Sequence, residues 1–170
     1  VSRPGADVLE VGFGRGIASA IIQEHDVGVH TIIECNPHVV KQFEDWKANY
    51  TGRDIRMIEG MWQDVTDQLQ LYDGIFFHTY PLDDQEYVEY VAHSVTFAQH
   101  FFDTAARHLR EGGTFTYLTN EADSLSRSHQ RLLLQHFSSF TMGLVTGLDI
   151  PQDSGDSHWS KQMVVVRAQK

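Results

Sequence analysis

The chain has 170 residues, of which 41% are hydrophobic and 21% charged, and its formal net charge is −10 at pH 7. This length and composition indicate one globular domain over residues 1–170, with enough apolar side chains for a sizeable core. The acidic balance argues against nucleic acid as a partner, because phosphate backbones bind clustered Lys and Arg. Small or cationic molecules are the expected partners.

Cysteine usage and hydropathy narrow the class further. Cys35 is the single cysteine, so an intrachain disulfide is excluded. No apolar run is long enough to cross a membrane, and no signal peptide is recognisable. A cytoplasmic location without a membrane partner is therefore expected.

Strand-like and helix-like patterns alternate along the chain. Strands are expected at about 7–12, 30–35, 54–59, 72–78 and 113–119, and helices near 15–25, 37–49, 62–69, 84–109 and 127–137. Asn36-Pro37 predicts a helix N-cap followed by its first residue, and Glu111-Gly112-Gly113 is expected to end the long fourth helix. Two β-rich runs, Ser139–Ile150 and Trp159–Ala168, flank a polar loop and predict a terminal hairpin.

This alternation predicts an α/β fold with a mostly parallel sheet, helices on both faces and a closing antiparallel hairpin. Ligands of such sheets bind at the carboxyl ends of the strands, near the point where the strand order reverses. The residues that follow the first four strands are therefore the candidate site.

The most informative pattern is Glu10-Val-Gly-Phe-Gly-Arg-Gly16, at the end of the first strand. Glycines at alternate positions let the backbone turn tightly and expose N–H groups at a helix N-terminus. A dinucleotide-binding G-x-G-x-x-G would need glycine at position 17, which is Ile17, so NAD is disfavoured. The pattern instead resembles the first motif of class I S-adenosylmethionine (SAM) methyltransferases. The expected cofactor contacts in this motif are Glu10, Gly12, Phe13, Gly14 and Gly16.

The next two strands supply further cofactor candidates. Glu34 ends the second strand, at the distance from the glycines where a carboxylate holds a ribose. Cys35 follows it and joins the expected contacts, with a packed and inert thiol. After the third strand, Gly60 leads into Met61 and Trp62, whose thioether and indole suit the faces of an adenine ring. The alternative is that Trp62 belongs to the core at the start of a helix.

The fourth strand ends in Phe77-His78-Thr79-Tyr80-Pro81-Leu82, where methyltransferases of this class present the group that faces the acceptor. Methyl transfer needs alignment and a site for the acceptor proton, and a neutral imidazole accepts a proton near pH 7. His78 is therefore the catalytic candidate; a simple strand-end hydrogen bond is the alternative. Asp83 is a candidate for attracting a cationic acceptor, or else for the solvated first turn of a helix.

No metal site is expected. The ten histidines include His93, His100 and His108, all placed on the expected long helix, but their spacings are too wide for one ion.

Four segments together resemble guanidinoacetate N-methyltransferase and the related fungal arginine N-methyltransferase: Val8–Phe13, Ile32–Asn36, Glu59–Val65 and Thr79–Leu82. The resemblance implies a class I methyltransferase sheet of order 3-2-1-4-5-7-6, SAM as the methyl donor, and Thr79 and Tyr80 in the acceptor pocket. The family carries an aspartate where this chain has His78. It also carries an N-terminal segment over the cofactor, so the sequence is expected to be a fragment whose site a partner chain or a homodimer completes.

Three hypotheses follow. The first is SAM-dependent N-methylation of a small guanidino or amino compound, with O-methylation using His78 as base as its variant. The second is a SAM-binding scaffold or regulatory domain that has lost catalysis. A nucleotide-dependent oxidoreductase is the third, disfavoured by Ile17 and the terminal hairpin.

Overall fold

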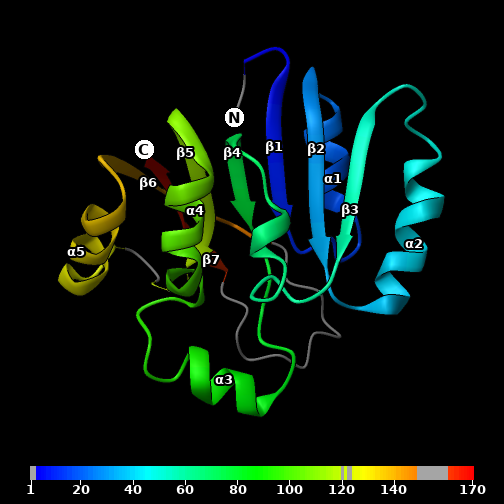
Figure 1. Ribbon diagram of the computed structural model, residues 1–170. Helices are drawn as coiled ribbons and strands as arrows, with labels where there is room; N and C mark the ends of the chain where they lie inside the picture. Colours follow the sequence, from blue (N-terminus) through cyan, green and yellow to red (C-terminus); the bar gives the residue numbers. More distant parts are fainter. Residues whose placement is uncertain (1–2, 120, 122–123, 149–160) are drawn as a thin grey trace.

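A computed structural model describes residues 3–119, 121, 124–148 and 161–170, which form a seven-stranded sheet (Figure 1). The strand order is β3-β2-β1-β4-β5-β7-β6, as predicted. Strands β1 to β5 run parallel to their neighbours, and β7 runs antiparallel to both β5 and β6. The strands are β1 (Ala6–Val11), β2 (Val27–Glu34), β3 (Asp54–Glu59), β4 (Tyr72–Phe77), β5 (Leu109–Thr119), β6 (Ser139–Thr146) and β7 (Gln162–Gln169).

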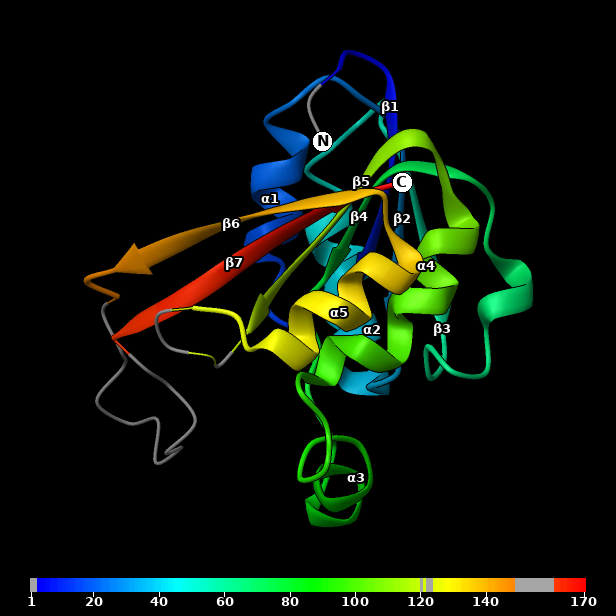
Figure 2. The same cartoon turned by 90° about the vertical axis from the view of Figure 1, so that its left-hand side faces the viewer.

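Helices cover both faces of the sheet. The first face carries α1 (Ile17–Gln23) and α2 (Pro37–Lys47), and the second carries the 3₁₀ helix η2 (Phe97–Phe101), α4 (Phe102–His108) and α5 (Arg127–His136) (Figures 1 and 2). A further helix, α3 (Asp84–Tyr90), projects beyond the carboxyl ends of the strands. No helix in the described part of the chain has the length and hydropathy to cross a membrane.

Each face has its own core. On the second face, the rings of Phe77, Phe101, Phe102 and Phe115 pack together, with centroids 5.2–6.5 Å apart in the closest pairs. Each fully buried ring stabilises the fold by about 1.5–3 kcal/mol. On the first face, a smaller cluster is built around Phe43 of α2. These two cores fix the sheet between its helices.

Several helix boundaries agree with the sequence. Asn36 is the N-cap of α2, where its side chain accepts a hydrogen bond from the N–H of His38 at 2.9 Å, and Pro37 is the first helical residue. Pro has no N–H to lose at this position, and the Asn side chain satisfies one of the free donors of the first turn. This boundary is confirmed.

The long helix expected over 84–109 is wrong. The chain leaves α3 after Tyr90 and starts again only at Thr96, whose backbone is extended (φ −155°, ψ 149°). Val95 and Thr96 are β-branched and disfavour continuous helix, so two apolar patterns with a break between them were merged. His93, His100 and His108 therefore do not share a helix.

The expected end of that helix at Glu111-Gly112-Gly113 is also wrong. The helix ends at His108, because Leu109 is already extended and begins β5. Gly112, with φ of +73°, lies inside this strand, near an irregularity in its pairing with β4. The glycine thus serves a strand irregularity, which also favours positive φ.

Two further expectations are corrected or bounded. The helix expected over 62–69 is only a short 3₁₀ helix, η1 (Thr66–Gln68), because Val65 is buried and holds the segment in turns. The terminal hairpin is confirmed as β6 and β7, although the strands are shorter than expected. The polar loop between them, with Ile150 and Trp159, lies outside the described residues.

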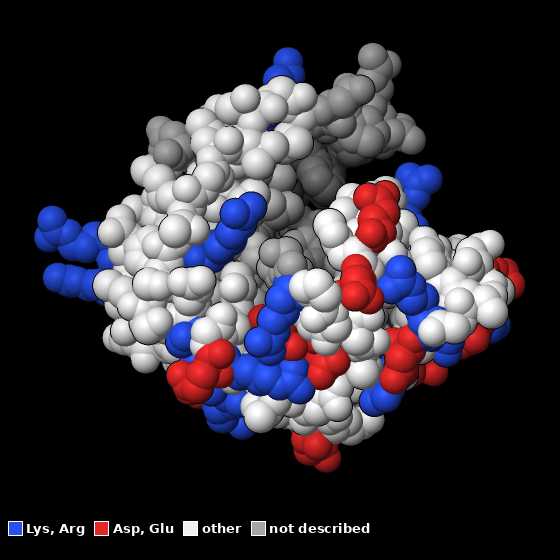
Figure 3. All heavy atoms as spheres, turned by 90° about the horizontal axis from the view of Figure 1, so that it is seen from above, with Lys and Arg blue, Asp and Glu red and all other residues white. Residues whose placement is uncertain are grey.

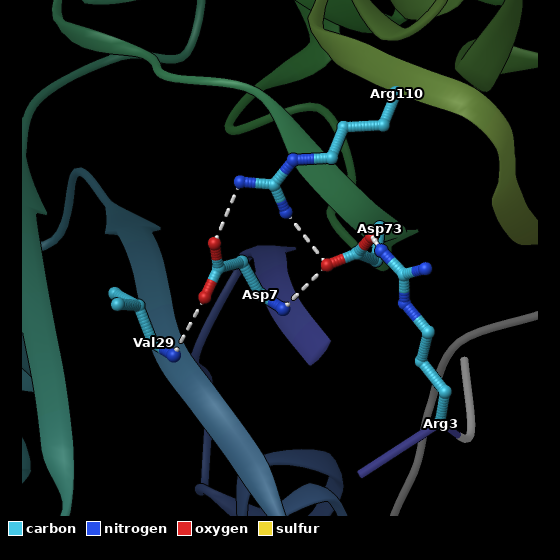
Figure 4. Close-up of polar contacts among 5 residues, drawn as sticks. All are labelled: Arg3, Asp7, Val29, Asp73 and Arg110. Atoms are coloured by element: carbon cyan, nitrogen blue, oxygen red, sulfur yellow. Dashed lines mark hydrogen bonds and ion pairs between the residues drawn. The ribbon is translucent and has the colours of Figure 1, made fainter. Parts of the chain in front are cut away.

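An ion-pair cluster ties together the strands at the end of the sheet opposite the candidate site (Figure 4). Arg110 of β5 donates to Asp73 of β4 at 2.6 Å and to Asp7 of β1 at 2.8 Å. Arg3 pairs with Asp73 as well, and Asp7 accepts the N–H of Val29 of β2 at 3.0 Å. The two carboxylates therefore join four strands.

A buried polar chain anchors α5 to the sheet. The ring of His129, which has no exposed surface, lies 2.5 Å from the Tyr117 hydroxyl and 2.5 Å from a Glu121 carboxylate oxygen. Burial, and secondarily the Glu121 charge, raise the pKa of Tyr117 far above its usual value. Tyr117 therefore stays neutral and is placed to donate to the imidazole.

We predict that Arg110→Ala lowers the free energy of unfolding by about 1–2 kcal/mol, because it leaves two largely buried carboxylates unpaired; the partial exposure of Arg110 keeps the loss below that of a fully buried pair. Urea unfolding measures the difference. Arg107→Ala is the control, since its ion pair with Asp103 is exposed on both sides and contributes little.

The destabilisation should also depend on pH. Burial alone would raise the pKa of Asp73, but the N–H of Asp7 and the Arg110 and Arg3 guanidiniums together lower it below its model value of 3.8. The pairing therefore contributes stability above about pH 4 and loses it as the pH falls through the folded pKa. A difference between Arg110→Ala and the parent that stays constant down to pH 2 would contradict this account.

Candidate active site

Backbone hydrogen bonds tie together the loops that follow the first four strands. The N–H of Gly12 donates to Ile33 at 2.9 Å, that of His78 to Val11 at 2.9 Å, and that of Gly60 to Glu34 at 2.9 Å. The segments expected to bind ligand are thus held against each other at one edge of the sheet.

Gly12 allows the end of β1 to approach the end of β4 closely. A Cβ atom at this position would lie 2.4 Å from the carbonyl oxygen of His78, and the backbone of Gly12 has φ of +95°. Both observations require glycine, the first for space and the second for conformation. The glycine pattern is therefore explained at this position by contact with the fourth strand.

Glu34 organises the turn between β1 and α1. One carboxylate oxygen accepts the N–H groups of Phe13 (3.1 Å) and Gly14 (3.3 Å), and the other accepts those of Cys35 and Asn36, both at 2.9 Å. These four bonds engage about as many lone-pair positions as a carboxylate offers. A ribose that binds here must share or replace them.

A narrow hollow lies beside Glu34. Six of the expected cofactor residues line it, and residues from β4 and beyond close it: Gly12, Glu34, Cys35, Gly60, Met61 and Trp62, with Thr79, Tyr80, Leu82, Glu86 and Phe97. Its volume is about 20 Å³, far smaller than a nucleoside. The loop 79–86 must move outward to admit one.

Trp62 faces both the hollow and the core. Its ring packs edge-on against Phe77 at 6.0 Å and against Phe101 at 5.5 Å. It therefore combines the two interpretations that its sequence position allowed, although it lies in a turn and not at the start of a helix. Cys35 borders the hollow with a pKa raised by burial and by the neighbouring Glu34 charge, so its thiol stays protonated.

Three expected contacts lie beside the hollow without lining it. The ring of Phe13 turns away and packs against Phe43 and Trp46 at 5.5 and 5.3 Å, so only its backbone faces the turn. Gly16 (φ +71°) starts α1 where a Cβ would meet the Phe13 ring at 2.8 Å. Gly14 (φ +54°) has open space around it.

Glu10 is placed differently from the expectation. It has no exposed surface, and one carboxylate oxygen takes both the Ser19 hydroxyl at 2.5 Å and the His30 ring at 3.0 Å. Gln23 contacts the other ring nitrogen of His30 at 3.0 Å. A side chain without accessible surface does not touch a ligand in this conformation. Glu10 instead fixes α1, and with it the glycine turn, to β1 and β2.

A second, wider cavity of about 560 Å³ adjoins the hollow. The two share Thr79, Tyr80, Leu82 and Phe97. This volume is within the range of small-molecule sites. His78, Thr79, Tyr80 and Asp83, which were expected on the acceptor side, all line it.

His78 stands at the inner end of the wide cavity. Its ring stacks on Phe76 (5.5 Å, 16°) and meets the edge of Tyr80 (5.8 Å, 77°), and no described residue forms a hydrogen bond with its imidazole. Burial lowers the pKa of His78, and the charge of Glu10 opposes this only in part. The imidazole is therefore neutral at pH 7 and available to a ligand.

Asp83 is the N-cap of α3, where its carboxylate accepts the N–H of Glu86 at 2.9 Å. The helix-capping alternative thus describes its local bonding, although it also borders the wide cavity. Among the described residues, no group of three or more His, Cys, Asp or Glu is placed to hold a metal ion.

The sequence interpretation missed the far wall of the wide cavity. Phe97 and Ala98 of η2, Leu118 and Thr119 of β5, and Met163 of β7 line it. The general rule that strand ends gather at one edge would have indicated the β5 residues. Nothing local marks Phe97 or Met163 as site residues.

Comparison with known proteins decides the family. The model of the guanidinoacetate N-methyltransferase family matches residues 1–139. The chain belongs to this family. Its cofactor is therefore SAM, as the glycine motif and Glu34 predicted.

Curated relatives agree. The chain is 35% identical over 80 residues to "Protein arginine N-methyltransferase 2" of Candida glabrata and 32% identical over 96 residues to that of Emericella nidulans, covering 43% and 54% of this chain. The matched segments span only 19% and 22% of those proteins.

Solved structures confirm the Rossmann-like methyltransferase fold. A precorrin-6y C5,15-methyltransferase from Geobacter metallireducens superposes with a TM-score of 0.70 at 15% identity, covering 99% of this chain and 82% of the other. A spermidine synthase from Thermotoga maritima gives 0.65 at 14% identity, covering 98% and 54%. Identities this low establish the fold alone.

We predict that Gly12→Ala abolishes measurable binding of S-adenosylhomocysteine, since its methyl group would strike the His78 carbonyl and separate β1 from β4. Gly14→Ala is the matched control, because it has space and costs only about 1 kcal/mol of backbone strain. Calorimetric titration of both variants measures the effect, with circular dichroism to check the fold. Equal losses in the two variants would contradict the steric explanation.

Glu34→Gln should weaken binding of the same ligand about tenfold or more, because a charged acceptor of ribose hydroxyls becomes neutral. The variant keeps one carbonyl oxygen for the turn, so it tests the ligand contact with less damage to the loop than an alanine would cause. Unchanged affinity would place the ribose elsewhere.

Proposed function

We propose that this chain is the catalytic domain of a SAM-dependent N-methyltransferase that acts on a guanidino or amino nitrogen. The observation that carries the proposal is the position of His78, a neutral imidazole at the boundary of the wide cavity, next to the two residues shared with the narrow hollow. The names of the curated relatives, which describe arginine N-methylation of proteins, support a nitrogen acceptor.

The residues of the narrow hollow suit SAM. Glu34 offers a carboxylate for ribose hydroxyls, Met61 and Trp62 offer soft faces for adenine, and Gly12 keeps the wall free of a side chain. Bound SAM supplies an electrophilic methyl group on a sulfonium. The part played by the protein is to hold that group in line with the acceptor nitrogen and to exclude water from the line of approach.

His78 handles the proton. The acceptor nitrogen attacks through its lone pair, the bond between methyl carbon and sulfur breaks, and the methylated nitrogen must lose one proton. A free imidazole nitrogen at this position accepts it. Since a neutral imidazole is a weak base, it serves an amine more readily than a guanidinium, which the family holds with an aspartate at this position.

A SAM-binding domain without turnover is the second candidate. The 20 Å³ hollow and the four amide bonds already made by Glu34 favour it, because both oppose entry of the nucleoside. Binding of S-adenosylhomocysteine together with no methylation of amines, arginine, guanidinoacetate or arginine-containing peptides would select it.

His78→Gln should lower kcat by roughly a hundredfold or more, because proton acceptance is lost while stacking on Phe76 is largely kept. In the parent enzyme, kcat should rise with pH through a pKa below 6.5 and then level off, since only the neutral ring accepts a proton. This limb should be missing in the variant. Rate measurements between pH 5 and 8 test both points.

His78→Asp should shift acceptor preference toward guanidinium compounds. A carboxylate restores charge pairing and two parallel hydrogen bonds, which an imidazole does not provide. The ratio of kcat/KM for guanidino and amino acceptors measures the shift. An unchanged ratio would mean that His78 does not face the acceptor.

A further inference from the structure

Strand β6 forms an edge of the sheet and is exposed over nearly its whole length. Among the described residues, no strand pairs with its outer side. Met142 and Leu144 are 49% and 50% exposed, and Val145, which points to the opposite face, is 40% exposed. Figure 2 shows the β6–β7 hairpin reaching out from the body of the domain. The strand thus offers both backbone groups and apolar side chains.

Natural edge strands usually carry features that prevent pairing, such as charged residues, proline or bulges. Strand β6, with sequence SFTMGLVT, has neither charge nor proline, and its register with β7 is regular from Ser139 to Thr146. An eight-residue apolar edge without these features is a site for another strand.

The charge distribution favours this side for contact with another acidic chain. Residues 124–148 and 161–170 contain no Asp or Glu, although the whole chain has a net charge of −10. Their basic residues are Arg127, Arg131, Lys161, Arg167 and Lys170. At the left-hand margin of Figure 3, which is the α5 side of Figure 1, the charged atoms are basic. A second copy meets the least repulsion from its own kind here.

We propose that β6 pairs antiparallel with β6 of a second copy, which forms a twofold dimer with one continuous sheet. A strand that pairs antiparallel with itself closes the contact, so no open chain of copies results. Arg167 is the basic residue nearest to the axis and pairs with Thr141 on β7, one strand inward. The two Arg167 side chains then lie roughly 14 Å apart, beyond a screening length of about 8 Å.

Apolar side chains complete the contact. Met142 and Leu144 oppose Val166 and Val164, which are buried on the α5 side of the sheet. Leu134 of α5 is 58% exposed on the same side. Pairing at the edge brings the Met142 and Leu144 side chains of both copies together and removes them from water.

Sedimentation equilibrium of the 170-residue chain over a wide range of concentrations tests the dimer. The parent should show a mass that rises to twice that of the monomer. Leu144→Lys combined with Val145→Lys places a charge on each face of the edge and should raise the dissociation constant at least about tenfold. Both positions are exposed, so the monomer fold is kept, which circular dichroism checks.

Ile17→Lys combined with Ile21→Lys is the matched control, since it adds the same charge at exposed apolar positions of α1. It should leave the dimer intact. A parent that stays monomeric, an edge variant that still dimerises, or a control that dissociates equally would each overturn the proposal. Slow hydrogen exchange of β6 amides in the parent but not in the edge variant would support it.

Discussion

The contact between the ends of β1 and β4 is the constraint on which the site depends. The N–H of His78 is bonded to Val11, and Gly12 leaves room for the His78 carbonyl only because it has no side chain. This contact sets the distance between the glycine turn and the strand that carries the catalytic candidate. A methyl transfer requires donor and acceptor to be aligned within fractions of an ångström, so the backbone must provide that alignment before any side chain acts.

Two groups of polar residues support this contact from opposite ends of the sheet. Near the site, Glu10 links α1 to β2 through Ser19 and His30, all without exposed surface. At the far end, Arg110 joins the carboxylates of Asp7 and Asp73. Buried polar groups are costly unless they are paired, so each group restricts the strands to one relative placement. The parallel strands are thus fixed along their length as well as across the sheet.

Much of the fold followed from local sequence patterns, because they are set by local physics. The apolar runs gave the strands and the hairpin, and Asn36-Pro37 gave the start of α2. The merged helix over 84–109 shows the limit of this approach, since the break at Thr96 depends on packing of η2 against distant strands. For the same reason, no pattern near Glu10 revealed its partner His30 twenty residues away, and none placed Phe97 or Met163 at the cavity. The residues of the glycine turn and of the β2 and β4 ends were accessible because their motifs are contiguous.

The loop 79–86 bounds both the narrow hollow and the wide cavity, through Thr79, Tyr80 and Leu82. Any displacement that makes room for the nucleoside therefore changes the shape of the acceptor cavity. Two ligands that reshape one loop are energetically coupled, and the coupling is reciprocal: if donor binding tightens acceptor binding by some factor, acceptor binding tightens donor binding equally. A protein built in this way binds its donor and acceptor in a preferred order, and the motion of a single short loop sets that order.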